Sequence, residues 1–226
     1  MSAAPGEGRA ESPPSPESIK AVSPAADGSA EADPAGNGWL GAWTVLGVTL
    51  VFGLVTDLVS KWAAFRYIAE IPAVVSRADV LAADRLGSLL PPHDPFVVIP
   101  SVLHLTLVLN PGAVFGIGAG QRWLFVGFTV VAIVFSIWIF LKWTTPRDRW
   151  AHAAIGLLLS GGIGNLYDRL VFGCVRDFLH PLPGVELPFG IAWPSGSREV
   201  WPYVSNIADL WLIVGIAVLL VYSWRK

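Results

Sequence analysis

The stretch Gly161–Phe178, GGIGNLYDRLVFGCVRDF, changes from apolar sequence suited to a membrane helix into a cluster of Asn, Asp and Arg. A charged side chain near the bilayer centre costs about 2.5–3.5 kcal/mol on insertion scales, so these charges require a structural or functional reason. A shorter cluster, Asn206-Ile-Ala-Asp209, opens the last apolar segment. We interpret the two clusters as pieces that bring Asp177 and Asp209 together.

The composition is that of a membrane protein. The 226 residues are 54% hydrophobic and only 14% charged, whereas soluble domains carry about 25% charged residues. The net charge of −2 gives no argument for nucleic acid as a partner. Cys174 is the one cysteine, which excludes an internal disulfide and any multi-thiol metal site.

The first 38 residues differ from the rest of the chain. They are rich in Ala, Pro and Ser, lack aromatic residues, and carry more acidic than basic side chains. Such a segment buries too little apolar surface to offset the entropy lost on ordering. We therefore predict that residues 1–38 form a disordered acidic tail in front of a membrane domain at 39–226.

Four segments of this domain are apolar enough to cross a bilayer. The predicted all-α membrane fold has spans at about 39–60, 122–142, 150–170 and 205–224. Four spans place both termini on one side. Basic residues in the loop 142–149 and at the C-terminus favour the cytoplasm for that side.

This topology brings four polar clusters to one membrane face, whichever side that face is. They lie where spans one and three exit and where spans two and four enter: Asp57, Asn110–Gly118, Asn165–Asp177 and Asn206–Asp209. The opposite face has only a short basic loop and the termini. The convergence predicts the location of a functional site.

Two further patterns bear on the architecture. Residues 96–109 are rich in β-branched side chains and interrupted by Pro100, which predicts one or two short strands and a small sheet over the helices. Within the third span, Gly156, Ser160 and Gly164 repeat every four residues. This stripe of small residues predicts a close approach by another helix.

Helical spacing groups several of the polar residues. Asn165, Asp168 and Arg169 share one helix face, Asn206 and Asp209 share another, and Asp57 and Lys61 are four residues apart. Two interpretations of Asp168–Arg169 and Asp57–Lys61 stay open: interfacial ion pairs that anchor helix ends, or groups with a direct chemical role.

Asp177 and Asp209 are the best candidates for catalysis. Two close carboxylates at a partly dehydrated boundary repel each other and share a proton near neutral pH, so one can activate water while the other protonates the leaving amine. The alternative is two solvated interfacial acids.

The other candidate residues have less support. Cys174 lacks a supporting His–Asn arrangement for a nucleophile. Asp177 and His180 lack further metal ligands such as an HExxH motif, so we predict no metal.

Five motifs in order carry a resemblance to a known family: Asp57-Leu-Val-Ser-Lys61, Asn110-Pro-Gly-Ala-Val-Phe115, Gly161-Gly-Ile-Gly-Asn-Leu-Tyr-Asp-Arg169, Val175-Arg-Asp-Phe178 and Asn206-Ile-Ala-Asp209. From about residue 40 to the end, the chain resembles the lipoprotein signal peptidases, the type II signal peptidases of bacterial inner membranes. Two positions depart from the family pattern, Leu58 in place of Gln and Ser205 in place of Phe. The outer loops 69–104 and 179–205 are longer than typical.

The resemblance implies an aspartyl endopeptidase that removes signal peptides from diacylglyceryl-modified prolipoproteins just before the lipid-bearing cysteine. It implies catalysis by Asp177 and Asp209 without metal or organic cofactor, and a site at the outer leaflet under an extracytoplasmic sheet. The implied partners are prolipoproteins and membrane lipids, and the enzyme is expected to be a monomer. The residues expected to support the loops and contact substrate are Asp57, Lys61, Asn110, Gly112, Asn165, Asp168, Arg169 and Asn206.

Two other hypotheses stay open from the residues alone. One is an intramembrane aspartyl protease of the presenilin or prepilin-peptidase kind, although no Gly-x-Gly-Asp motif occurs. The other is a small non-enzymatic transporter or scaffold whose acids relay protons. A transporter predicts ionisable residues on both sides of the membrane midplane, whereas here they gather on one face, with His152 as the main exception.

Overall fold

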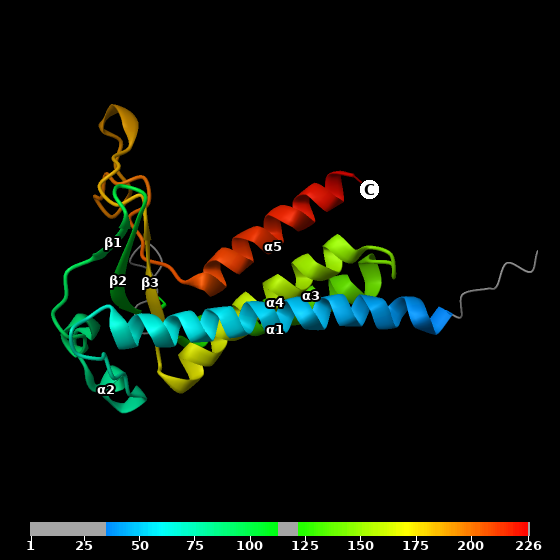
Figure 1. Ribbon diagram of the computed structural model, residues 1–226, viewed down its shortest axis with the longest axis horizontal. Coiled ribbons are helices and arrows are strands. Elements are labelled where there is room, and N and C mark those ends of the chain that lie inside the picture. Colours follow the sequence, from blue (N-terminus) through cyan, green and yellow to red (C-terminus); the bar gives the residue numbers. More distant parts are fainter. Residues whose placement is uncertain (1–34, 113–121, 226) are drawn as a thin grey trace, which may run out of the picture. The chain divides into compact units, whose positions relative to one another are not determined.

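The computed structural model describes residues 35–112 and 122–225 (Figure 1). Its long helices carry a small antiparallel sheet at one end. In chain order the elements are α1 (Ala35–Tyr67), α2 (Arg77–Ala82), η2 (Leu86–Leu89), β1 (Phe96–Ile99), β2 (Leu103–Asn110), α3 (Arg122–Trp143), α4 (Arg149–Val171), β3 (Val175–Pro181), η3 (Pro188–Gly190) and α5 (Ile207–Trp224). The predicted tail through residue 34 and the motif residues Ala113–Phe115 lie outside the described ranges.

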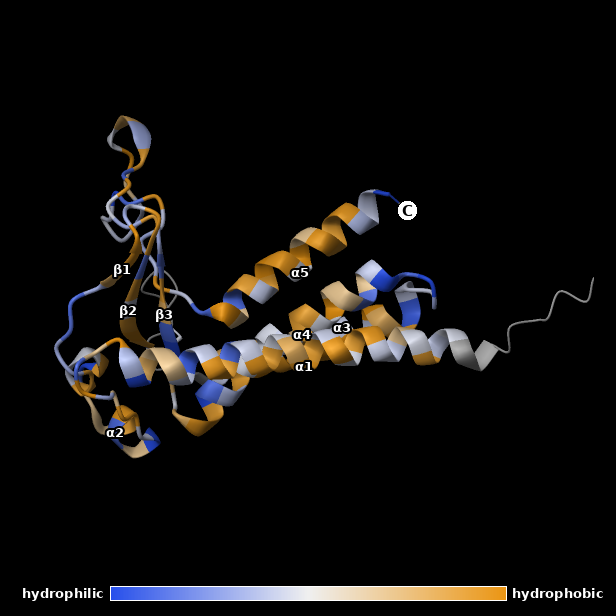
Figure 2. Cartoon of the chain, in the orientation of Figure 1, coloured by the Kyte–Doolittle hydropathy of each residue, from blue (hydrophilic) through white to orange (hydrophobic). Residues whose placement is uncertain are grey.

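Three helices in the described ranges are long and apolar enough to cross a membrane, namely residues Gly38–Tyr67 of α1, Trp123–Trp143 of α3 and the whole of α5. Figure 2 shows the apolar character of these helices in orange. Helix α1 begins at Ala35, four residues before the predicted start of the membrane domain at residue 39. The same helix continues to Tyr67, beyond the predicted end near residue 60, because the sequence 61–67 has neither Gly nor Pro to stop it.

Helix α4 packs against α1, α3 and α5 and is the most buried of the long helices. The stripe of small residues permits the predicted close approach of another helix, and that helix is α1: a Cβ on Gly156 would overlap the Thr49 side chain, and Ser160 lies against Gly53. On the side of α5, a Cβ on Gly161 would overlap the carbonyl of Ala208. Small side chains therefore let three helix backbones approach closely, which brings the polar groups on α1, α4 and α5 within hydrogen-bond reach.

The sheet has the order β1-β2-β3, with both pairs antiparallel. Residues 96–109, expected to form one or two short strands, contain two, with Pro100 at the start of the turn between them. The third strand, β3, pairs Val108 opposite Asp177 and Asn110 opposite Val175. The motif around Asp177 is therefore a strand, which the sequence patterns did not predict.

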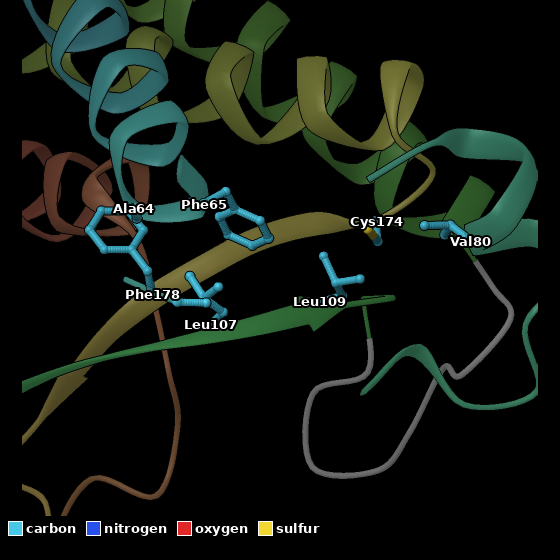
Figure 3. Close-up of a cluster of buried hydrophobic side chains, with 8 residues drawn as sticks. Ala64, Phe65, Val80, Leu107, Leu109, Cys174 and Phe178 are labelled. Atoms are coloured by element: carbon cyan, nitrogen blue, oxygen red, sulfur yellow. The ribbon is translucent and has the colours of Figure 1, made fainter. Parts of the chain in front are cut away.

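A hydrophobic cluster joins the sheet to the end of α1. Figure 3 shows Phe65 of α1 facing Leu107 and Leu109 of β2, with Cys174 and Phe178 from β3 and the segment before it. Side chains alternate between the two faces of a strand. Burial of Phe178 against α1 therefore turns its neighbour Asp177 toward the opposite face.

Candidate active site

Asp177 is almost completely buried on β3, with 1% of its surface exposed. Both of its carboxylate oxygens accept hydrogen bonds from side-chain amides. Asn110, at the end of β2, donates from Nδ2 to Oδ2 at 3.0 Å, and Asn206 donates from Nδ2 to Oδ1 at 2.6 Å. The strand pairing and these two amides define the direction in which the carboxyl group points.

Asp209 lies in the first turn of α5 and forms a capping box with Asn206. The backbone N–H of Asp209 donates to Asn206 Oδ1 at 3.1 Å, and the backbone N–H of Asn206 donates to Asp209 Oδ2 at 3.2 Å. Asn165 of α4 donates to Asp209 Oδ1 at 2.7 Å. Three elements of hydrogen bonding therefore fix the position of the Asp209 carboxylate at the N-terminus of α5: the Asn165 amide, the backbone N–H of Asn206 and the capping box.

Asn206 therefore contacts both carboxylate-bearing residues, which come from different elements of the fold. Burial, and to a lesser degree the charge of Asp209, raises the pKa of Asp177 to about 7. The hydrogen bonds from Asn110 and Asn206 to the carboxylate act in the opposite direction. A buried acid that titrates near pH 7 beside a second, charged acid can release and recover a proton under physiological conditions.

A network of buried charged residues contacts the residues that hold the two carboxylates. Lys61 is completely buried, and its Nζ lies 2.9 Å from Asp57 Oδ2 and 3.4 Å from Asp168 Oδ2. The same Nζ donates to Asn165 Oδ1 at 3.2 Å. Asp57 in turn accepts a hydrogen bond from the backbone N–H of Ala208 at 2.9 Å. Lys61 and Asp57 thus connect α1 to the residues of α4 and α5 that hold Asp209.

Comparison with known proteins decides the family. A model of the signal peptidase (SPase) II family matches residues 49–225. The chain belongs to the signal peptidase II family. Lipoprotein signal peptidase from Syntrophotalea carbinolica is 34% identical over 168 residues, covering 73% of this chain and 95% of that one. The protein of the same name from Desulfitobacterium hafniense DCB-2 is 37% identical over 125 residues, 55% of this chain and 70% of that one.

A solved bacterial membrane enzyme, determined by the in meso method at 2.3 Å resolution, has a similar fold. It matches with a TM-score of 0.54 at 25% identity, over 84% of this chain and 88% of that chain. The resemblance stated from the motifs is thereby confirmed. Membership of signal peptidase II makes the protein a peptidase and decides against a non-enzymatic transporter or scaffold.

In this signal peptidase II the acidic side chain of Asp168 pairs with Arg176 as well as Lys61. The Arg176 backbone N–H donates to Asp168 Oδ2 at 3.0 Å, and Nη2 lies 2.8 Å from Oδ1. Arg176 also stacks on the Phe172 ring at 4.1 Å. Sequence reasoning did not assign Arg176 a role. Strand alternation was the signal that could have found it, because it places Arg176 on the face opposite Asp177.

Arg169, the helical neighbour that could have paired with Asp168, makes different contacts. Its Nη1 donates to the backbone carbonyl of Asn165 at 3.2 Å, and its guanidinium lies 5.6 Å from the centre of the Phe125 ring. Asp168 therefore does not form an ion pair with Arg169, because both of its carboxylate oxygens contact Lys61 or Arg176. The negative charges of Asp209 and Asp177 attract the Arg169 guanidinium. The Asp57–Lys61 pair does form, but it is buried rather than interfacial.

Gly112 belongs to the site through its backbone. Its N–H donates to Asn110 Oδ1 at 2.8 Å, which leaves the amide nitrogen of Asn110 directed to Asp177. The φ of Gly112 is +98°, a conformation that favours glycine, and a Cβ would also meet the Phe125 ring.

The other candidates from the sequence are the pair Asp177 and His180 as metal ligands, the thiol of Cys174, and His152. Asp177 and His180 are on a strand rather than a helix, so their three-residue spacing directs them to opposite faces; His180 Nε2 lies 3.4 Å from Glu199 Oε2. Cys174 is buried in the hydrophobic cluster, and burial raises the pKa of its thiol to about 12. His152 is buried against Phe140, and its Nε2 lies 3.1 Å from Thr144 Oγ1.

Proposed function

We propose that this protein cleaves the signal peptide from diacylglyceryl-modified prolipoproteins, just before the lipid-bearing cysteine, and that Asp177 and Asp209 are its catalytic pair. The observation that carries the proposal is the double contact of Asn206, which binds the Asp177 carboxylate and caps the helix turn that holds Asp209. The names of the related proteins supply the class of substrate.

The proposed chemistry needs one proton on the pair and one ionised carboxylate. Burial raises the pKa of Asp177 to about 7, so we assign the proton of the pair to Asp177. We assign the role of the ionised carboxylate to Asp209, which accepts hydrogen bonds from the Asn165 amide and the backbone N–H of Asn206. The ionised carboxylate accepts a proton from water as the water oxygen attacks the scissile carbonyl. The protonated carboxyl then supplies the proton that the departing amine requires, so one proton enters the pair and one leaves.

The other site residues have positioning or binding roles in this proposal. Asn110, Gly112, Asn165 and Asn206 orient the two carboxylates through the bonds given above. Asp57, Lys61 and Asp168 hold the three helices in register. Arg169 is half-buried and subject to the charges of both catalytic residues, and we assign it to contact with the substrate backbone.

The proposed membrane placement has four spans, with α4 as the third. Helix α4 has 23 residues, or about 35 Å at a rise of 1.5 Å per residue, enough to cross the hydrocarbon core. It lies among α1, α3 and α5, so its own surface needs less apolar character than theirs. Both termini are then cytoplasmic in a bacterial inner membrane, and the sheet covers the site at the outer leaflet. We propose a monomer whose substrate lipid stays in the bilayer.

The direct test is cleavage of a lipidated prolipoprotein by the purified protein in phospholipid nanodiscs. We expect Asp177→Asn and Asp209→Asn each to reduce kcat/KM by about 1,000-fold or more, the scale of loss when one member of a catalytic group is removed. Asp84→Asn is the matched control, because Asp84 is an exposed acid remote in sequence from the site motifs. Wild-type activity in either catalytic variant contradicts the proposal, and thermal unfolding checks that the variants are folded.

A further inference from the structure

Residues 182–204, between β3 and α5, form an ordered projection that we call the arm. Its two sides are cross-linked by backbone hydrogen bonds, from Leu187 N to Arg198 O and from Val200 N to Val185 O, both at 2.7 Å. At its base, Leu179 and Ser205 exchange two bonds of 2.8 Å. The arm therefore has a defined hairpin-like shape rather than that of a loose connection.

The tip of the arm, residues 187–197, reads LPFGIAWPSGS and contains no charged residue. Two of its large apolar side chains are exposed: 97% of Phe189 and 56% of Ile191 is accessible to solvent. Phe189 also has a φ of +62°, a costly conformation for a bulky residue. Trp193 stiffens the tip, because its indole N–H donates to the Glu199 carbonyl at 2.8 Å. The backbone is thus shaped so that an aromatic ring is presented away from the rest of the protein.

The base of the arm lies at the N-terminal end of a candidate membrane span. The arm ends next to Asn206, the N-cap of α5, and α5 is a candidate membrane span from its first residue, Ile207. Figure 1 shows the arm, in orange, projecting sideways from the line of α1 instead of extending it. A segment that projects sideways from the end of a membrane helix keeps its tip near the depth of the bilayer surface.

The surface next to the arm is also apolar. Leu182 N donates to Val102 O at 2.8 Å, which attaches the arm to the turn between β1 and β2. Val102 and the β1 residues Phe96 and Ile99 are exposed. Such a continuous apolar edge is unfavourable in water and marks an interaction surface.

We propose that the tip of the arm inserts into the headgroup layer of the membrane in which the helices lie, so that a phospholipid surface covers Phe189 and Ile191. Aromatic residues favour this layer, because their rings match its mixed polarity. Arg198, the only basic residue between 182 and 205, is exposed just behind the tip, where its charge can meet lipid phosphates. This interaction is separate from the proposed cleavage reaction and needs only α5 to cross the bilayer.

The test is site-directed spin labelling of Phe189→Cys in nanodiscs of phosphatidylcholine and phosphatidylglycerol. Cys174 is completely buried with a thiol pKa of about 12, so the wild-type protein serves as an unlabelled blank. Power saturation compares collisions of the label with oxygen, which concentrates in lipid, and with a water-soluble nickel chelate. Asp84→Cys is the matched control for an exposed charged position. Thermal unfolding of the labelled variants, compared with that of the wild type, shows that they are folded.

We expect the label at 189 to collide more with oxygen than with nickel, and the label at 84 to show the reverse. A label at 189 that collides mainly with nickel, as at 84, overturns the proposal in favour of an arm that stands in water. A label shielded from both reagents also overturns it, since a protein surface rather than lipid then covers the tip. Neither result depends on whether Asp177 and Asp209 are catalytic.

Discussion

Asn206 donates a hydrogen bond to Asp177 across 2.6 Å and thereby joins strand β3 to the first turn of α5. The opposite end of the same amide accepts from the backbone N–H of Asp209 at 3.1 Å. One planar side chain therefore sets the relative position of two carboxyl-bearing residues from different elements. An amide suits this position because it has both a donor and an acceptor at fixed separation.

Substitution of Asn206 separates its two roles. Serine is a good N-cap but has no amide to reach Asp177, whereas alanine provides neither interaction. We expect Asn206→Ser to keep most of the thermal stability and to lower kcat/KM by about ten- to a hundredfold, the equivalent of a lost hydrogen bond to a charged group. Asn206→Ala should lose similar activity and a further ~0.5–2 kcal/mol of stability.

The pH dependence distinguishes positioning from a merely structural role of Asn206. The hydrogen bond from Asn206 lowers the pKa of Asp177, so its loss in Asn206→Ser should move the alkaline limb of the activity profile to higher pH. A profile that keeps its wild-type midpoint, at reduced height, would argue that Asn206 acts only on the fold.

The wild-type enzyme should lose activity as the pH rises through about 7. Asp177 has a pKa raised to about 7 and supplies the proton for the leaving amine, so its ionisation above that pH removes the general acid. The measurement is kcat/KM for a lipidated substrate between about pH 5 and 9 in nanodiscs, a range that brackets this ionisation. A rate that stays constant across that range would show that protonated Asp177 is not required.

The ionisation of Asp177 should also lower the stability of the folded protein as the pH rises. The folded-state pKa of Asp177 is raised from 3.8 to about 7, so the native protein binds the proton more tightly than the unfolded chain does. Its contribution to stability is complete below about pH 4 and is lost as the pH rises to about 7, a change of about 4 kcal/mol at about 1.36 kcal/mol per pKa unit. Asp177→Asn should therefore raise the unfolding temperature more at about pH 8 than at about pH 5, because most of the loss of wild-type stability occurs between these two pH values. Equal effects at both pH values would mean that Asp177 does not titrate in this range.

Gly164 on α4 is predicted to be intolerant of a methyl group. A Cβ there would overlap Asp57 Oδ2, which bonds Lys61, and would displace the carboxylate whose other oxygen bonds Ala208. We expect Gly164→Ala to destabilise the protein by about 1–3 kcal/mol, the usual cost of overpacking. The control is Gly127→Ala on α3, where a Cβ has open space and alanine favours the helix by up to about 1 kcal/mol. Thermal unfolding of both variants checks the difference, and equal behaviour would contradict it.

Removal of the Lys61 charge should be among the most damaging changes outside the catalytic pair. Lys61→Met leaves Asp57 and Asp168 buried with one cation fewer, which costs about 3–5 kcal/mol when a buried pair is broken. The double variant Lys61→Met/Asp57→Asn should recover part of this loss, because the amide oxygen introduced at position 57 can still accept from the Ala208 N–H. Unfolding temperatures of the two variants and of Asp57→Asn alone give the coupling energy. A double variant less stable than Lys61→Met would refute the proposed charge balance.

Much of the architecture follows from local patterns. The apolar segments of α1, α3 and α5 predict membrane helices, since length and hydrophobicity act locally on each segment. The turn at Pro100 is also local in origin, because proline has no backbone N–H to donate within a sheet. The repeat of Gly156, Ser160 and Gly164 correctly indicates a close helix contact, because helical geometry places these residues on one face.

The strand β3 shows where such patterns fail. Val175–Pro181 is short and mixes apolar with charged residues, so its periodicity is weak. It becomes a strand because its backbone pairs with β2 and its apolar side chains fill the cluster against α1. The same packing decides that Asp168 meets Arg176, eight residues away, rather than its helical neighbour Arg169. These choices depend on contacts between distant segments, which no window of the chain contains.

The sequence alone determined the membrane class of the protein, the order of its five motifs and the two candidate catalytic acids, because composition and motif order are properties of the chain itself. The tertiary structure decided how these acids are held. Close packing of α4 brings Lys61, Asn165 and Ala208 together, and the strand pairing of β3 turns Asp177 toward Asn206. The burial that raises the pKa of Asp177 exists only once these elements have assembled, because a carboxyl group in the unfolded chain stays in water.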